Sequence, residues 1–151
     1  QLREKLSAMQ INIDNLNEQI TDLNADRDSL ASVSQSKERI IEEKTTALNT
    51  AYYAIGTKKE LENNSVIEKT GGFLGLGKTL TLKEDYNQNY FKKIDIRTDK
   101  TIPLMAEEAE VITTHPGDSY TITGKETADS LVIKNPERFW GATKYLVIVL
   151  D

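Results

Sequence analysis

The sequence contains no cysteine and only one histidine. The absence of cysteine excludes disulfide frameworks, zinc–thiolate sites and thiol nucleophiles, and no second imidazole is present to complete a histidine metal site. Long apolar runs are also missing, because the longest, Leu146 to Leu150, is far shorter than the roughly 20 residues that span a bilayer. We therefore expect no membrane-spanning segment, and the lack of cysteine says nothing about the redox compartment.

A basic excess is missing as well. The net charge is −5, with six basic and nine acidic residues in residues 1–56, and 13 basic and 15 acidic residues in 57–151. Phosphate backbones attract proteins with the opposite balance, so we expect no nucleic-acid partner. Because the chain begins at Gln1 in the middle of a heptad, we also expect a preceding segment, which could carry a signal or anchor.

What the sequence does contain is a heptad repeat over its first 55 residues, free of proline and glycine. With Leu6 at position a, twelve of the sixteen a and d positions are apolar. Isoleucine at a with leucine at d packs best in parallel two-stranded coiled coils. The repeat predicts a helical stalk over residues 1–56 that forms a homo-oligomer, most favourably a parallel dimer. The expected oligomer interface consists of Leu2, Leu6, Met9, Ile13, Leu16, Ile20, Leu23 and Leu30.

The repeat is irregular in its second half. The interrupting residues are Arg27, Ser34, Lys37 and Lys44, and an apolar edge at position g is formed by Val33, Ile40 and Ala47. The apolar stripe thus becomes as wide as the stripe of an ordinary amphipathic helix. This half of the helix could therefore pack against a surface other than the same helix of a second copy. The first e and g positions are mostly Asn and Gln, so strand orientation is weakly specified. Antiparallel and trimeric pairing stay open, as does a single helix folded back on the rest of the chain.

The remaining residues, 57–151, are enough for one small domain with a modest core. Gly56 fits a helix C′ position, and Thr57 with Glu60 forms a capping box that predicts a short helix near residues 58–65. Asn135 as N-cap and Pro136 at N1 predict another through Trp140.

Between the two short helices the hydrophobic period becomes two, which predicts five or six short strands. The pairs that carry this period are Leu80 and Leu82, Ile94 and Ile96, Ala109 and Val111, Tyr120 and Ile122, and Leu131 and Ile133. Residues 85–90 indicate a helical turn. Residues 145–150 indicate a strand that is apolar on both faces and hence central or covered. The fold class expected is α+β: a long N-terminal coiled coil followed by a small, mostly antiparallel β-rich domain with short helices.

The segment from Gly72 to Thr79 matches the phosphate-binding pattern G-x-x-x-x-G-K-[ST]. That motif must lead into a helix N-terminus, whereas the residues after Lys78 alternate as a strand would, and no buried parallel strand precedes them. Nucleotide binding is therefore a distant alternative. A better interpretation is a glycine-flanked loop whose apolar residues, Phe73, Leu74 and Leu76, tuck into the core or form a partner-binding loop.

Other groups that could carry chemistry have ordinary explanations. His115 lies in a His-Pro-Gly-Asp turn and is expected to be solvated. The acidic residues Glu107, Glu108, Glu110 and Asp118 fit no calcium-loop spacing, and Ser119 and Ser130 have no base at a characteristic spacing. We predict a protein that is not an enzyme, with no catalytic residues, metal or cofactor.

The C-terminal two-thirds of the chain resembles a family of coiled-coil envelope lipoproteins of Gram-negative bacteria, often labelled collagen-binding glycoprotein adhesins. The segments that carry the resemblance are Tyr52-Tyr53-Ala54-Ile55-Gly56-Thr57, Gly71-Gly72-Phe73-Leu74-Gly75, His115-Pro116-Gly117-Asp118-Ser119-Tyr120, and the ending Phe139-Trp140 to Tyr145-Leu146-Val147-Ile148-Val149. The resemblance implies a lipid anchor upstream, a coiled-coil stalk, and a location in the cell envelope, either anchored in the outer membrane or periplasmic.

Two function classes follow. In the first, an oligomeric stalk displays the β-rich domain as an interaction module, an adhesin for collagen or another extracellular ligand, whose weak contacts add through avidity. In the second, the coiled coil is the working surface of a structural or scaffolding envelope protein, and the domain only caps it. The two classes differ in whether the β-rich domain binds anything.

Overall fold

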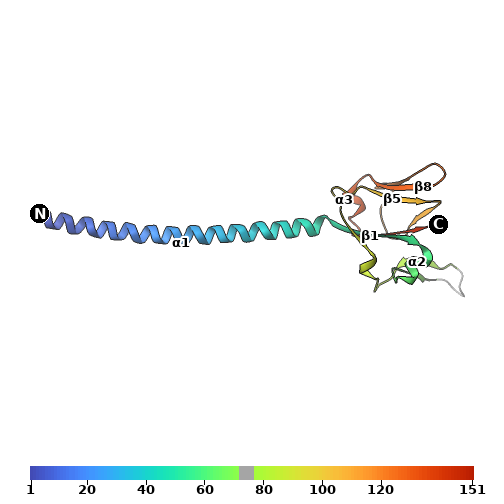
Figure 1. Ribbon diagram of the computed structural model, residues 1–151, viewed down its shortest axis with the longest axis horizontal. Coiled ribbons are helices and arrows are strands. Elements are labelled where there is room, and N and C mark those ends of the chain that lie inside the picture. Colours follow the sequence, from blue (N-terminus) through green and yellow to red (C-terminus); the bar gives the residue numbers. More distant parts are fainter. Residues whose placement is uncertain (72–76) are drawn as a thin grey trace. The chain divides into compact units, whose positions relative to one another are not determined.

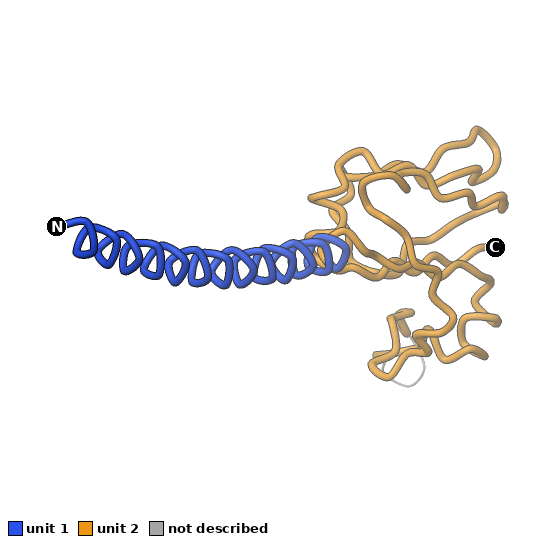
Figure 2. The backbone as a smooth tube through the Cα atoms, turned by 60° about the vertical axis from the view of Figure 1, so that its left-hand side comes forward, with its two compact units in different colours: residues 1–47 blue, residues 48–151 orange. Residues whose placement is uncertain are grey.

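The computed structural model describes residues 1–71 and 77–151, which form two compact units, residues 1–47 and 48–151 (Figure 2). The first unit consists of most of α1 (Leu2–Asn49), one uninterrupted helix of 48 residues (Figure 1). At 1.5 Å per residue such a helix is about 70 Å long. The predicted fold class, a long N-terminal helix followed by a mostly antiparallel α+β domain, is confirmed.

The predicted end of the helix was wrong. Residues 50–56, which complete the heptad pattern in sequence, belong instead to strand β1 (Thr50–Thr57), so Gly56 lies in a strand and is no C′ residue. Ala51 and Ile55, which continue the heptad pattern in sequence, are part of the domain instead. Ala51 is fully buried and Ile55 packs against the same core. Pairing on both sides with other strands overrides the helical pattern here.

Among the described residues of the second unit, nine strands make three sheets. The first sheet has the order β4 (Lys92–Asp95), β1, β9 (Tyr145–Leu150), β6 (Ala109–Val111); the second has β5 (Thr101–Ala106), β8 (Ala128–Ile133), β7 (Tyr120–Thr123); the third pairs β2 (Ile67–Thr70) with β3 (Thr79–Leu82). All described pairings are antiparallel except that of β1 with β9, which is parallel. The central position predicted for residues 145–150 is confirmed.

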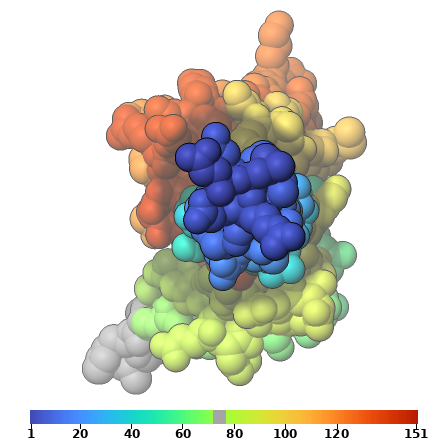
Figure 3. Space-filling view, turned by 90° about the vertical axis from the view of Figure 1, so that its left-hand side faces the viewer, coloured from blue at the N-terminus to red at the C-terminus, as the bar shows by residue number. Residues whose placement is uncertain are grey.

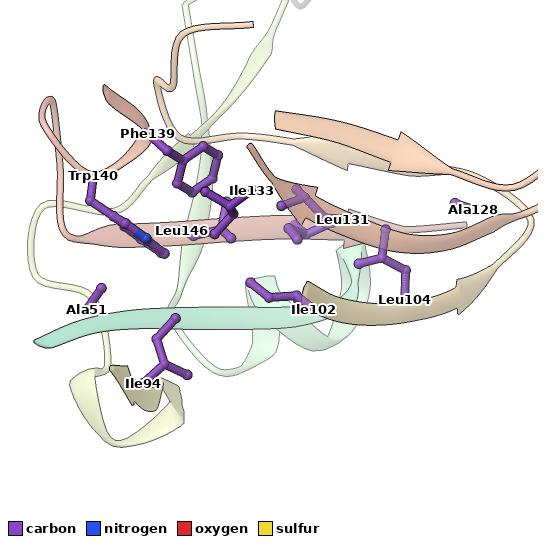
Figure 4. Packing of buried hydrophobic residues seen from close by; sticks show 11 residues of the cluster. Ala51, Ile94, Ile102, Leu104, Ala128, Leu131, Ile133, Phe139, Trp140 and Leu146 are labelled. Atoms are coloured by element: carbon purple, nitrogen blue, oxygen red, sulfur yellow. The ribbon is translucent and has the colours of Figure 1, made fainter. Parts of the chain in front are cut away.

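Alternate residues of β9 point into two separate cores. Leu146 and Ile148 join the larger cluster, which lies between the four-stranded sheet and the β5–β8–β7 sheet and includes Phe139 and Trp140 (Figure 4). Val147 and Val149 join a second cluster with Leu61 of α2 (Lys58–Asn63) and residues of the β2–β3 hairpin. The four-stranded sheet is thus covered on both faces, which explains the continuous apolar run in β9.

The two short helices start as their caps predict. The Thr57 hydroxyl accepts a hydrogen bond from the Glu60 amide at 3.3 Å, and the Glu60 carboxylate accepts one from the Thr57 amide at 2.8 Å. Asn135 caps α3 (Pro136–Phe139) by accepting from the Arg138 amide at 3.0 Å. The helical turn expected at residues 85–90 is the 3₁₀ helix η1 (Gln88–Tyr90).

Replacing Ile148 by alanine should lower the free energy of unfolding of the β-rich domain by about 2–5 kcal/mol, because Ile148 is fully buried in the central strand. Trp140, the only tryptophan, is 2% exposed in the same core, so its fluorescence during urea unfolding reports this domain alone. Met105→Ala is the control, since Met105 is 87% exposed and its truncation should cost less than about 0.5 kcal/mol. Equal effects of the two changes would contradict this account of the core.

Candidate functional site

Most of the exposed large apolar side chains among the described residues lie on α1, where they form a stripe. All the predicted interface residues are exposed, their exposed fractions being Leu2 75%, Leu6 59%, Met9 61%, Ile13 48%, Leu16 57%, Ile20 55%, Leu23 66% and Leu30 69%. No residue of α1 is buried. Figure 3 looks toward the N-terminal end of α1 (blue).

Few interactions within α1 support it as a separate helix. Arg39 and Glu43 form an i,i+4 ion pair at 4.0 Å, and the Gln10 amide donates a hydrogen bond to Asp14 at 3.0 Å. Such exposed pairs contribute only about 0.2–0.5 kcal/mol each, and the helix is rich in Asn, Asp, Ser and Thr, which have low helix propensity. A helix of this composition needs a partner surface along its stripe to be stable.

The predicted partner-binding loop, Phe73, Leu74 and Leu76, lies outside the described residues, as does Gly72 of the phosphate-loop pattern. The rest of that pattern is described: Lys78 leads into strand β3, where Thr79 is paired with Thr70 of β2 in antiparallel register. A phosphate-binding loop needs a helix N-terminus at this point. The local structure after Lys78 therefore does not supply the anion-binding geometry that the motif requires.

His115 is not a solvated turn residue, and that expectation was wrong. Its half-buried ring stacks on Phe139 with ring centroids 4.0 Å apart and contacts Trp140 edge-on at 5.7 Å. Its Nδ1 is 2.8 Å from the Phe139 carbonyl oxygen, and its Nε2 is 3.0 Å from the Thr113 hydroxyl. Sequence reasoning missed these contacts because Phe139 lies 24 residues away in the chain.

The hydrogen bonds of His115 define its tautomer. A carbonyl oxygen can only accept, so Nδ1 carries the proton, and Nε2 of the neutral ring accepts from the Thr113 hydroxyl. That hydroxyl in turn accepts from the Val147 amide of β9 at 3.0 Å. Burial lowers the pKa of His115 below its ordinary value, although the hydrogen bond to Phe139 acts in the opposite direction. The ring is thus a neutral structural link between α3, the 113–119 turn and the central strand.

Other polar candidates also have structural partners. Asp118 forms an ion pair with Arg138, and the fully buried Ser119 donates its hydroxyl hydrogen bond to the Pro116 carbonyl. Arg97 binds Asp95 through two guanidinium nitrogens and lowers the pKa of that carboxyl group to about 2. Within residues 1–71 and 77–151, no group of three acidic or histidine side chains is arranged to hold a metal ion.

Two open hollows on the domain lack a catalytic arrangement. One, of about 370 Å³, is lined by Thr81, Leu82, Ile112, Thr113, Thr114, Ala142 and Thr143, none of which is titratable near neutral pH. The other, of about 330 Å³, is lined by Asn49, Ile96, Arg97, Lys100, Lys134, Asn135, Pro136 and Glu137. Of its three cations, Arg97 is paired with the Asp95 carboxylate and Glu137 offsets one more charge.

The outer face of the β5–β8–β7 sheet is uncharged and rich in hydroxyl groups. Register places Thr101, Val132 and Thr121 in one row across the sheet, and Pro103, Ser130 and Thr123 in the next. These six residues, which we call the hydroxyl face, alternate with the inward residues Ile102, Leu131 and Ile133 of the larger core. Sequence reasoning missed this surface because β5, which contains a proline, was not predicted as a strand.

No known protein family, curated protein or solved structure matches this chain. Among the helices of the described chain, none has the length and apolar character needed to cross a membrane. The geometry of the described chain offers two exposed surfaces on which a function can rest, the α1 stripe and the hydroxyl face.

Protonation of His115 should destabilise the domain. Because the folded pKa of this histidine lies below its unfolded value of about 6.5, its contribution to stability is present above that pH and is lost as pH falls toward the folded pKa. We expect the free energy of unfolding, followed by Trp140 fluorescence in urea, to fall between pH 7.5 and pH 5. The stabilising contribution of Asp95, whose pKa is about 2, is constant over this range and is lost only below about pH 4.

His115→Phe keeps the stack on Phe139 but removes the titrating group. The variant should be less stable at pH 7.5, because the Thr113 hydroxyl and the Phe139 carbonyl lose their partner, and its stability should change less between pH 7.5 and pH 5 than that of the wild type. Equal pH slopes in the two proteins would show that His115 does not titrate in this range.

Proposed function

We propose that this protein is a non-enzymatic, self-associating coiled-coil protein in which α1 pairs with α1 of a second copy and so links two copies of the β-rich domain. The observation that carries the proposal is the exposed apolar stripe along α1, from Leu2 to Leu48. Exposed apolar surface of this extent is typical of an interaction site. The repeat of isoleucine at a and leucine at d favours a second copy as the partner, and two strands as the number.

In this proposal the β-rich domain is the interaction module and α1 is the stalk that presents it. Two linked copies multiply weak contacts with a repetitive target, because the second contact becomes intramolecular. The hydroxyl face is the domain surface best suited to such contacts. Its six side chains are uncharged, and the register of the sheet sets them at regular intervals. Resemblance to coiled-coil envelope lipoproteins supports a location in the cell envelope and collagen as the first target to test.

Ile20→Asp should convert the dimer into a monomer, because it places a charge in the middle of the apolar seam. Light scattering coupled to size exclusion should give about twice the 17.0 kDa chain mass for the wild type and the chain mass for the variant. Ile11→Asp is the matched control: Ile11 is 58% exposed, like Ile20 at 55%, but it lies at position f, away from the seam. Loss of the dimer in both variants, or in neither, would contradict the proposed interface.

Dimeric wild type should bind immobilised collagen at least 10-fold more tightly than monomeric Ile20→Asp at equal domain concentration, because only the dimer gains avidity. Thr121→Lys with Thr123→Lys, on the hydroxyl face, should weaken binding by both proteins, as measured by surface plasmon resonance. If neither protein binds collagen, the adhesin function for this target fails, and the scaffolding alternative, in which the coiled coil is the working surface, takes its place.

A further inference from the structure

We infer that the two α1 helices run parallel and in register, and that cations inside the seam set this arrangement by pairing with acidic residues of the second copy. The pairs are Arg27 with Asp26 of the second copy and Lys37 with Glu38 of the second copy. This inference rests on the self-association proposed above and names the residues that decide its geometry.

One heptad register holds along the whole seam, because α1 is uninterrupted from Leu2 to Asn49. In a parallel pair, a side chain at position a fits between four residues of the facing helix, at a, at the preceding g, and at the d positions before and after. A side chain at position d fits between the residues at d, at the following e, and at the a positions before and after. Arg27 at a thereby meets Asp26 at g of the second copy. Lys37 at d meets Glu38 at e of the second copy.

These four side chains are available in the single chain. The Arg27 side chain is 72% exposed and, among the described residues, pairs with its neighbour Asp28 at 2.9 Å. The ion pairs formed between described residues include none with Asp26, Lys37 or Glu38. A second helix can therefore pair with these groups without breaking an ion pair of Asp26, Lys37 or Glu38.

An antiparallel pair lacks this charge complementarity at the two seam lysines, Lys37 and Lys44. Full overlap, with a positions facing d positions, sets Lys37 opposite Ile13 and Lys44 opposite Leu6. The e and g residues that flank Ile13 and Leu6 are Arg3, Lys5, Gln10, Asn12 and Asn17, none of which is acidic. Lys37 would thus lie against apolar and amide groups, and Lys44 would lie beside Arg3 and Lys5, which repel it.

The parallel arrangement has its own cost, since each seam cation also faces its twin. For Arg27 and Lys37 the neighbouring acids of the second copy offset this repulsion. Lys44 has only Thr45 at the corresponding position e, so the seam is weakest near its C-terminal end, where α1 gives way to β1. Polar groups in a seam commonly lower stability while fixing register, and Arg27 and Lys37 fill that role here.

Cysteine cross-linking tests orientation directly, because the wild type has no cysteine. Leu16 faces Leu16 in a parallel, in-register pair and Ser34 in the full-length antiparallel pair. Leu16→Cys alone should form a disulfide-linked dimer in a glutathione buffer. A mixture of Leu16→Cys with a size-tagged Ser34→Cys protein should give only the two self-linked products.

A cross-link only between Leu16→Cys and Ser34→Cys would show an antiparallel pair and overturn the inference. A mass of two chains by light scattering with neither cross-link would show a shifted register, which also overturns it while self-association stands. A mass of one chain for the wild type would instead refute the proposed function.

Charge exchange tests the residues. Asp26→Arg leaves Arg27 beside a second cation and should weaken the dimer on the order of 10-fold by sedimentation equilibrium. Exchanging both residues, Asp26→Arg with Arg27→Asp, should restore most of that loss. Asp22→Arg at position c, away from the seam, is the control. Failure of the double exchange to restore the dimer would show that this pair does not set the geometry.

Discussion

The parallel pairing of β1 with β9 is the interaction on which the rest of the structure depends. It joins the strand that directly follows α1 to the last strand of the chain, and it places both in the middle of the four-stranded sheet. Every other layer of the domain packs on one of the two faces that this pair creates. The same pairing fixes where the helix stops, because Ala51 and Ile55 are committed to the domain core and Leu48 is left as the last residue of the exposed seam.

Signals within a few residues of one another were enough to predict much of this fold. The Thr57–Glu60 capping box, the Asn135–Pro136 helix start and the continuously apolar strand at 145–150 are all present where they were expected. The helix end was not predictable in this way, because Ala51 and Ile55 satisfy the heptad as well as the sheet. Strand β5 escaped notice because Pro103 and a bulge, in which Met105 has φ 54°, break its pattern. The surroundings of His115 depend on Phe139, so only the folded chain brings them together.

Of the two candidate surfaces, one was predictable from the sequence and the other was not. The α1 stripe was predictable because helical periodicity depends on spacing alone, and every residue assigned to it is exposed in the structure. The hydroxyl face was not predictable, because its rows exist only once three strands that are distant in sequence take their register. The protein thus has two surfaces of different origin. The α1 stripe, proposed to bring two copies together, is predictable from local sequence, whereas the hydroxyl face, proposed to bind a target, is formed only by folding.

The central claim, that α1 owes its stability to a second copy, is tested most directly by melting one sample with two probes over a 100-fold range of protein concentration. If the claim holds, the helical transition seen by far-ultraviolet circular dichroism should shift to higher temperature as concentration rises, while the Trp140 fluorescence transition of the β-rich domain should move little. A helical transition that is independent of concentration would mean that α1 is stable without a partner copy, and it would contradict the account.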